Sequence, residues 1–310
     1  MPETIIITGA NGFIGSYLAK YFSEKKYHVI CVSRKYFTEV KKQLHDCELL
    51  EMDVMSDDFK NLQIQADNMI HLASANDIVS KNFQNGVELS LIGTKNAIDV
   101  CVKNNIPQFI FFSTMQVYES ELNGNYDEQT ISKPVNDYAF NHLIAEEYVA
   151  MASKKNGLKA SSVRPSNVYG AMMDAQIERW SLVPNCFIKE AIEKNNITLL
   201  SSGKQLRNFI SLQNVAKSTE AILNNLSIDY QLYNIASENN FSIVEVAKFT
   251  QEVFASEFNR QVELVVKSDK PNAADSFHIS IEKIKNLGVE NVDDENAIKT
   301  EIKKIIELLK

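Results

Sequence analysis

A glycine-rich loop near the start of the chain constrains its fold more than any other feature. The apolar run at residues 4–8 predicts a buried strand, and TGANGFIG (8–15) follows it directly. Gly9, Gly12 and Gly15 permit a tight turn, a close approach of the backbone to a pyrophosphate and close packing of the next helix on the strand. The free N–H groups in the first turn of this helix can donate hydrogen bonds to a phosphate. The loop therefore predicts a dinucleotide-binding βαβ unit.

The rest of the N-terminal half alternates short apolar runs with helical patterns. Strands that are apolar throughout and alternate with helices indicate a parallel sheet covered on both faces. We therefore expect an α/β protein with a Rossmann-type doubly wound parallel sheet and a smaller C-terminal α/β substrate lobe. The expected strands are 4–8, 28–33, 48–54, 68–74, 108–113 and 159–165, and the expected helices are 14–25, 85–105 and 137–157, the last stopped by Gly157.

The C-terminal half is less regular, and only part of it continues the βα pattern. We assign residues 1–165 plus about 207–236 to the dinucleotide-binding domain, the second range as a strand and helix followed by a further strand. Residues from about 166–206 plus 237–310 form the expected substrate-binding lobe.

Composition excludes several classes of protein. The net charge of −8 argues against a nucleic-acid surface, which needs clustered Lys and Arg. The four cysteines have no zinc-ligand spacing and suit a reducing compartment. The N-terminus lacks a basic leader, and no apolar run reaches membrane-spanning length. We therefore expect a cytoplasmic protein with no bound metal and with neither nucleic acid nor membrane as a partner.

The end of the second strand indicates which dinucleotide is bound. An NAD-binding protein usually carries Asp or Glu there, whereas this chain has Ser33, Arg34 and Lys35. A carboxylate repels a 2′-phosphate, and Arg beside a small hydroxyl accommodates it. We therefore predict NADP(H) rather than NAD(H). The alternative is that Arg34 and Lys35 belong to a solvated loop.

Motifs along nearly the whole chain resemble those of the extended short-chain dehydrogenases/reductases, the sugar-nucleotide epimerase, dehydratase and reductase family. The resemblance implies an NAD(P)-dependent enzyme acting on a nucleotide-activated sugar, in polysaccharide or deoxysugar synthesis. The motifs are TGANGFIG (8–15), Asp53 with Val54, HLAS (71–74), FFSTMQVY (111–118), YAFNHLIAE (138–146), RPSNVYG (164–170), RNFISLQNVAKS (207–218) and YNIAS (233–237).

The same resemblance implies binding residues. Two of the substrate positions have alternatives: Asn167 caps a turn, or Arg207 pairs with a surface carboxylate. We expect His71 to be a packed strand-end residue. The implied cofactor contacts are Gly9, Asn11, Gly12, Phe13, Ile14, Gly15, Ser33, Arg34, Asp53, Val54, Leu72, Ala73, Ser74, Tyr138, His142 and Pro165. The implied substrate contacts are Thr114, Asn167, Leu182, Val183 and Arg207.

The implied catalytic residues are Thr114, Tyr138 and His142, and the third departs from the family. His142 stands where the family has a lysine, and Ser90 replaces a family asparagine. The family's lysine ammonium lowers the pKa of the tyrosine, whereas a histidine with an ordinary pKa of about 6.5 is mostly neutral at pH 7.

This change affects the two directions of the reaction unequally. Alcohol oxidation needs a phenolate base, whereas ketone reduction needs a protonated phenol. The site therefore suits a keto-reductase better than an epimerase. A 4,6-dehydratase is disfavoured, because Met115 and Gln116 stand in place of the Asp–Glu pair of such enzymes. Two alternatives stay open: a degenerate dinucleotide-binding regulator or scaffold, and a reductase of a non-nucleotide carbonyl compound.

The helical stretches 85–105 and 137–157 correspond to the pair through which this family commonly dimerises. Their apolar residues exceed what one covered sheet face needs. We therefore expect a homodimer. Examples of the excess apolar residues are Ala145, Tyr148, Val149 and Met151.

Overall fold

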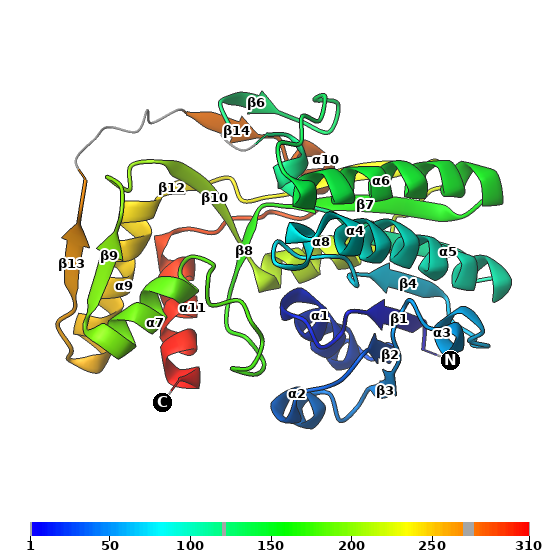
Figure 1. Cartoon of the computed structure of the whole chain (residues 1–310), viewed down its shortest axis with the longest axis horizontal. Coiled ribbons are helices and arrows are strands. Elements are labelled where there is room, and N and C mark those ends of the chain that lie inside the picture. The colour runs from blue at the N-terminus through cyan, green and yellow to red at the C-terminus, as the bar shows by residue number, and fades with distance from the viewer. Residues whose placement is uncertain (1, 120–121, 269–275, 310) are drawn as a thin grey trace.

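A seven-stranded parallel sheet with helices on both faces forms the larger part of the molecule (Figure 1). The computed structural model describes residues 2–119, 122–268 and 276–309. The strand order is β11-β7-β5-β4-β1-β2-β3, which contains the 3-2-1-4-5-6 order of doubly wound nucleotide-binding sheets. The predicted fold class is confirmed. The strands are β1 (Thr4–Thr8), β2 (His28–Ser33), β3 (Glu48–Glu51), β4 (Asn68–His71), β5 (Gln108–Phe112), β7 (Lys159–Pro165) and β11 (Gln231–Ile235).

Alternating side chains of the central strand feed two hydrophobic cores. Ile5 and Ile7 of β1 pack with α1 and α8, whereas Ile6 lies in a second cluster with α3, α5 and α6. Both faces of the sheet are therefore covered, which explains why its strands are apolar throughout. The helices that line the two faces are α1 (Phe13–Glu24), α2 (Thr38–Gln43), α3 (Asp57–Lys60), α5 (Gly93–Lys103), α6 (Asp137–Asn156), α8 (Leu212–Leu223) and α10 (Glu282–Lys285).

Helix α6 carries the YAFNH segment and is fixed at both ends and at its centre. The Asn136 side chain accepts from the N–H of Ala139, and Gly157 ends the helix in the left-handed conformation with φ of 68°. In the middle, Glu146 receives two hydrogen bonds from Arg164 of β7, of 3.0 and 2.6 Å, with both side chains only 4% exposed. This buried ion pair locks α6 to the sheet.

The segment between β4 and α5 also packs on α6 and is helical in short pieces. It contains η1 (Val79–Lys81), α4 (Phe83–Val87) and the π-helical turn η2 (Glu88–Ile92). The predicted helix over 85–105 is therefore divided. Single π-helical turns inside helices are frequent at functional sites.

The smaller part is built from three short sheets and three helices (Figure 1). Strand β10 (Leu206–Ser211) pairs with β8 and β12, so it lies outside the seven-stranded sheet, contrary to our assignment of residues from about 207 to the larger domain. Within residues 207–236, α8 and β11 return to that sheet. Helix α10 also packs on it, contrary to our assignment of 237–310 to the smaller lobe. The other elements are η3 (Met115–Val117), β6 (Gly124–Tyr126), β8 (Asn167–Tyr169), α7 (Asn185–Lys194), β9 (Asn196–Leu199), β12 (Asn240–Ser242), α9 (Ile243–Phe258), β13 (Glu263–Val266), β14 (Phe277–Ile279) and α11 (Glu295–Leu308).

The described residues contain neither a membrane-spanning helix nor a cluster of metal ligands. None of their helices combines the length and apolar character needed to cross a bilayer. Within the same ranges, no group of three or more His, Cys, Asp or Glu side chains is arranged to hold a metal ion.

Candidate active site

The glycine loop between β1 and α1 leaves no room for side chains. Gly9 has φ of +74°, and a Cβ atom there would lie 2.9 Å from the carbonyl carbon of Leu72. A Cβ atom on Gly15 would lie 2.3 Å from the Gly9 oxygen, so this glycine is needed for α1 to pack on the loop. Gly12 begins α1 without a side-chain cap. This leaves the N–H groups of the first turn, from Phe13 onward, to a ligand. The loop therefore fits a pyrophosphate.

Asn11 of the loop is hydrogen-bonded within the protein, whereas Arg34 near the loop is not. The Asn11 side chain accepts a hydrogen bond of 3.0 Å from the N–H of Phe37, so it ties the loop to the segment after β2. Ser33 ends β2, and the next residue, Arg34, is exposed. Within the described ranges, the Arg34 guanidinium forms neither an ion pair nor a hydrogen bond. It is therefore free to meet an anionic group.

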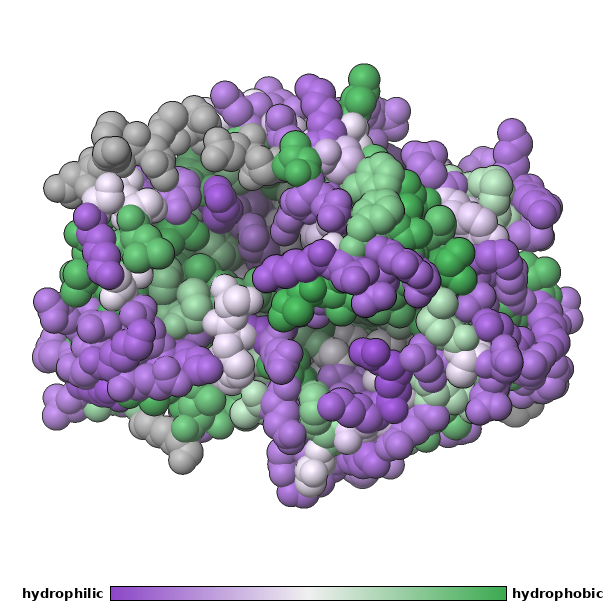
Figure 2. Space-filling model, viewed as in Figure 1, coloured by the Kyte–Doolittle hydropathy of each residue, from purple (hydrophilic) through white to green (hydrophobic). Residues whose placement is uncertain are grey.

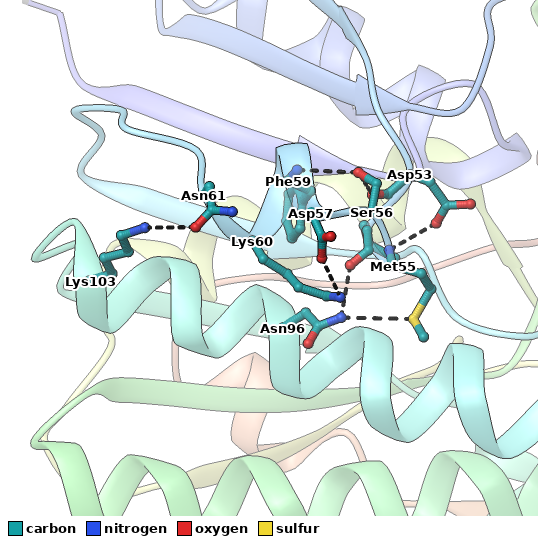
Figure 3. A network of polar contacts seen from close by, with 10 residues as sticks. Asp53, Met55, Ser56, Asp57, Phe59, Lys60, Asn61, Asn96 and Lys103 are labelled. Carbon is teal, nitrogen blue, oxygen red and sulfur yellow. Dashed lines mark hydrogen bonds and ion pairs between the residues drawn. The ribbon is translucent and has the colours of Figure 1, made fainter.

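The loop after β3 is fixed by a network of polar contacts with α5 (Figure 3). Asn96 of α5 donates to the Val54 oxygen at 3.0 Å, and its amide also contacts the Met55 sulfur. The Asp53 carboxylate accepts from the N–H of Met55 at 2.9 Å. Asp53 and Val54 thus form a rigid rim at the end of β3.

The loop after β4, residues 72–74, is held by the residue that replaces the family asparagine. The Ser90 hydroxyl accepts hydrogen bonds from the Ser74 hydroxyl at 2.9 Å and from the N–H of Ala75 at 3.1 Å. Ser90 itself lies in the π-helical turn and is buried. Leu72, Ala73 and Ser74 are only partly exposed and adjoin Gly9 at the carboxyl end of the sheet.

His71 ends β4 directly before this loop and is fully buried. Its Nδ1 atom lies 2.7 Å from the Thr8 hydroxyl, and burial lowers its pKa to about 3. The prediction of a packed strand-end histidine is confirmed.

Thr114 and Tyr138 meet where β5 ends and α6 begins. Thr114 precedes η3 and caps it by accepting from the N–H of Gln116 at 3.3 Å. Burial raises the pKa of Tyr138, while the nearby Thr114 hydroxyl and the charge of Arg179 act in the opposite direction. The phenol is therefore protonated at neutral pH and lies near the hydroxyl that the sequence predicted as its partner.

His142 lies one turn further along α6 and is packed against Tyr138. The two ring centroids are 4.5 Å apart, and the other side of the imidazole stacks near Phe111 at 6.1 Å. The Nδ1 atom lies 2.9 Å from the Tyr138 backbone oxygen, so Nδ1 carries the proton. Burial lowers the pKa of His142 to about 4. The ring is neutral at pH 7, with Nε2 as a hydrogen-bond acceptor.

A cavity of about 250 Å³ lies between the two parts of the molecule. Residues from the ends of β5, β7, β8 and β10 line it, including four that the sequence predicted: Thr114, Pro165, Asn167 and Arg207. Thr114, the stretch 165–167 and Arg207 are far apart in the chain, and the fold brings them together. Met115, Gln116, Glu119, Leu122, Ser166, Leu206, Asn208, Phe277 and Ile279 complete the lining.

Asn167 and Arg207 do not make the contacts that their alternative roles, a turn cap and a surface ion pair, would require. Asn167 does not cap a turn, because its amide donates to the Asn208 oxygen at 2.8 Å and joins β8 to β10. Arg207 has no carboxylate within ion-pair distance among the described residues, and its Nη1 atom donates to the Leu206 oxygen at 2.8 Å. Among the described residues, the cavity therefore contains a cation with no carboxylate at ion-pair distance.

The other two predicted substrate residues lie outside this cavity. Leu182 is exposed on the segment before α7, and Val183 packs against the core of the smaller part. Sequence reasoning also missed Glu119 and Arg179. Glu119 stands where the FFSTMQVY resemblance would place glycine, a departure that was visible in the sequence. Arg179 belongs to no motif, so no sequence signal marked it.

Comparisons with known proteins identify the family of the chain. The chain matches the model of the NAD dependent epimerase/dehydratase family over residues 5–236. A trifunctional UDP-glucose 4,6-dehydratase/UDP-4-keto-6-deoxy-D-glucose 3,5-epimerase/UDP-4-keto-L-rhamnose-reductase of Arabidopsis thaliana is 25% identical over 306 residues, or 93% of this chain and 44% of that protein. The chain thus spans less than half of this relative. A putative UDP-glucose 4-epimerase of Methanocaldococcus jannaschii is 25% identical over 99% of this chain and 98% of its own length.

Solved structures show the same fold. The UDP-glucose 4-epimerase of Thermotoga maritima with UDP-glucose has a TM-score of 0.84 at 20% identity, covering 99% of this chain and 100% of that one. The UDP-glucuronic acid 4-epimerase of Bacillus cereus with UDP-glucuronic acid and NAD has a TM-score of 0.83 at 21% identity, with the same coverage. With the family model matching most of its length, the chain belongs to the NAD dependent epimerase/dehydratase family.

Proposed function

We propose that this chain is an NADP(H)-dependent reductase of a keto group on a nucleotide-activated sugar. One observation carries the proposal: Thr114, which lies near Tyr138, lines a cavity together with Arg207, and no carboxylate of the described residues is within ion-pair distance of Arg207. A guanidinium in such a place suits the diphosphate of a nucleotide sugar through its fork of donors. The relatives named above, which act on UDP-sugars by their names, support the same substrate class.

In this reaction, separate residues bind the substrate, donate the proton and hold the cofactor. Arg207 and Asn167 hold the diphosphate end, so that the sugar lies against Thr114. A bound nicotinamide cofactor supplies the hydride. The Tyr138 phenol donates its proton to the oxygen of the reduced carbonyl group, and the Thr114 hydroxyl orients that oxygen by a hydrogen bond. The glycine loop and Ser74 hold the dinucleotide.

The protonation states of Tyr138 and His142 favour reduction over oxidation. Burial raises the pKa of Tyr138 and lowers that of His142, so the phenol is protonated and its neighbour uncharged at neutral pH. A protonated phenol is the general acid that reduction needs, whereas oxidation would start from the rare phenolate. Epimerisation is the second candidate, because several relatives are named epimerases.

The preference for NADP(H) rests on the end of β2. Ser33 is small, and the exposed Arg34 forms no ion pair within the described residues, so nothing there competes with a 2′-phosphate. The solved relatives named above include one with NAD, so the preference distinguishes this chain from that relative.

We further propose that the protein is a homodimer formed through α6 and the neighbouring segment 85–105. Ala145 and Val149, which we expected at this interface, lie in the core of the same chain and cannot contribute. Phe140 and Met151 of α6 are 42% and 51% exposed, and Figure 2 shows apolar surface in the region of this helix. Exposed apolar residues gathered on one helix are typical of an association surface.

A turnover screen tests the function. The protein is incubated with NADPH and with UDP- or dTDP-linked 4-keto-sugars, and absorbance at 340 nm is followed while products are identified by mass spectrometry. A reductase consumes one NADPH per product. Epimerisation of the parent UDP-sugars with no net change at 340 nm would favour the second candidate. Turnover of simple ketones alone would favour a non-nucleotide substrate, and binding of NADPH without any turnover would favour a regulator or scaffold.

A further inference from the structure

Glu119 is the one carboxylate that lines the cavity within the described part of the chain. It directly follows Tyr118, which is almost fully buried and whose hydroxyl lies 2.8 Å from Oδ1 of Asn234. Because this tyrosine fixes the backbone, Glu119 starts from a defined position at the cavity wall. The FFSTMQVY resemblance would place a glycine here, which has no side chain to offer a ligand. The carboxylate is therefore a group that this chain adds to the site.

Strand β6 holds one oxygen of this carboxylate. The Tyr126 hydroxyl donates to Oε1 of Glu119, and it accepts from the N–H of Asn123 at 3.0 Å. The Asn123 oxygen lies 3.1 Å from the same hydroxyl, but a charged acceptor forms the stronger bond. Tyr126 is buried and pairs in register with Ile279 of β14, another residue of the cavity lining (Figure 1). The Glu119 side chain is therefore anchored at the cavity.

The second oxygen of Glu119 is left for a ligand. Among the described residues, its Oε2 atom has no hydrogen-bond partner, and the side chain forms no ion pair. Arg207 lines the same cavity, and no described carboxylate lies within ion-pair distance of it, so these two charges do not pair with each other. The cavity thus offers a cation to an anionic group and a separate anion to hydrogen-bond donors.

The rest of the lining makes both charges effective. Several apolar side chains surround them, and apolar surroundings screen a charge weakly. These residues are Met115, Leu122, Leu206, Phe277 and Ile279. The cavity measures about 250 Å³, so a second carboxylate bound in it would lie close to that of Glu119.

We propose that Glu119 is a specificity-determining residue that selects a neutral sugar nucleotide over a nucleotide-linked uronic acid. Its free oxygen accepts a hydrogen bond from a hydroxyl group of the sugar, and its charge repels a sugar that carries a carboxylate. Juxtaposed like charges oppose binding, whereas a hydroxyl in the same place donates a charge-assisted hydrogen bond. The inference rests on the proposed function and deepens it by naming the charge of the sugar.

A pair of ligands that differ only at C6 of the sugar tests the inference by binding alone. UDP-glucose carries a hydroxymethyl group at this carbon, and UDP-glucuronic acid carries a carboxylate. Calorimetric titrations are made with saturating NADPH, because the reduced cofactor cannot oxidise either sugar. The parent protein should bind UDP-glucose at least about tenfold tighter than UDP-glucuronic acid. Glu119→Gln keeps an oxygen that accepts from Tyr126 and should reduce that ratio to below about threefold, chiefly by tighter binding of UDP-glucuronic acid.

Two further variants separate the charge of Glu119 from other effects. Glu290→Gln removes an exposed carboxylate outside the cavity and should keep the parent ratio. Glu119→Ala removes the charge together with the side chain and should lower the ratio as Glu119→Gln does. Equal affinities in the parent protein, or a ratio that survives both substitutions of Glu119, would overturn the inference and leave the proposed function standing. If neither UDP-sugar binds to the parent protein, the proposed substrate class fails as well, so the two failures are distinguishable.

Discussion

The Nδ1 atom of His142 donates a hydrogen bond of 2.9 Å to the backbone oxygen of Tyr138, one turn earlier on α6. That bond fixes the tautomer of a buried, neutral ring and leaves Nε2 unprotonated. At the position that the motif resemblance gives to a lysine, the helix therefore presents an acceptor. Our proposal has a cofactor ribose hydroxyl donate to Nε2 there.

Restoring the cation should change the balance between the two directions of reaction. In His142→Lys, an ammonium beside the phenol stabilises phenolate, the form required only for oxidation. We expect the alcohol-oxidising rate at neutral pH to rise more than the ketone-reducing rate. The measurement compares both rates for both proteins at pH 7. His142→Gln, which adds no charge, is the matched control, and an equal change in both directions for the lysine variant would contradict the interpretation.

Cofactor preference should depend on Arg34. The exposed guanidinium next to Ser33 has no acidic partner among the described residues, so a 2′-phosphate would gain a charge-assisted bond. Fluorescence titration should give NADPH binding at least several-fold tighter than NADH binding. Arg34→Ala should remove most of that difference while NADH affinity stays nearly constant. Lys35→Ala, one residue further on, is the control. Equal affinities in the parent protein would refute the preference.

The buried ion pair between Glu146 and Arg164 should dominate the stability of the α6–β7 contact. Glu146→Ala leaves a 4% exposed guanidinium without its carboxylate, which costs about 3–5 kcal/mol of unfolding free energy. Urea denaturation measures this value. Glu147→Ala, at the next position of α6, should cost well under 1 kcal/mol. A loss below 1 kcal/mol for Glu146→Ala would mean that the pair is not what holds the helix.

Association should fail when charge is placed on the exposed face of α6. Met151 is half exposed within the chain, so Met151→Glu should leave the fold intact but prevent burial of that face against a second copy. Light scattering at micromolar concentration should give a dimer for the parent protein and a monomer for the variant. A strictly monomeric parent protein would rule out the proposed assembly.

Much of this architecture was predictable because its determinants are local. The glycine loop, the apolar strands and Gly157 after α6 are each determined by a few neighbouring residues, and all three occur in the structure. The failures involve long-range pairing. Nothing in RNFIS reveals that β10 joins β8 instead of the large sheet, because either partner would bury the same side chains.

The site was predictable to the extent that motifs mark it. Thr114, Pro165, Asn167 and Arg207 line one cavity, and their contacts with cofactor or substrate stay predictions. Helical spacing did not distinguish the inward-facing Ala145 and Val149 from a dimer surface, since both surfaces are apolar. The ion pair of Arg179 with Asp77 depends on the path of residues 171–183, which the tertiary fold sets.

The central claim is that Tyr138 supplies the proton for reduction of a nucleotide-linked ketone. Tyr138→Phe removes the hydroxyl and keeps the ring that packs on His142. The most direct measurement is the rate of NADPH consumption by this variant with the 4-keto-sugar nucleotide that the parent protein reduces, alongside the NADPH dissociation constant of both proteins. We predict a loss of at least about 100-fold in rate with NADPH binding nearly unchanged. Full activity of Tyr138→Phe on that substrate would contradict the account.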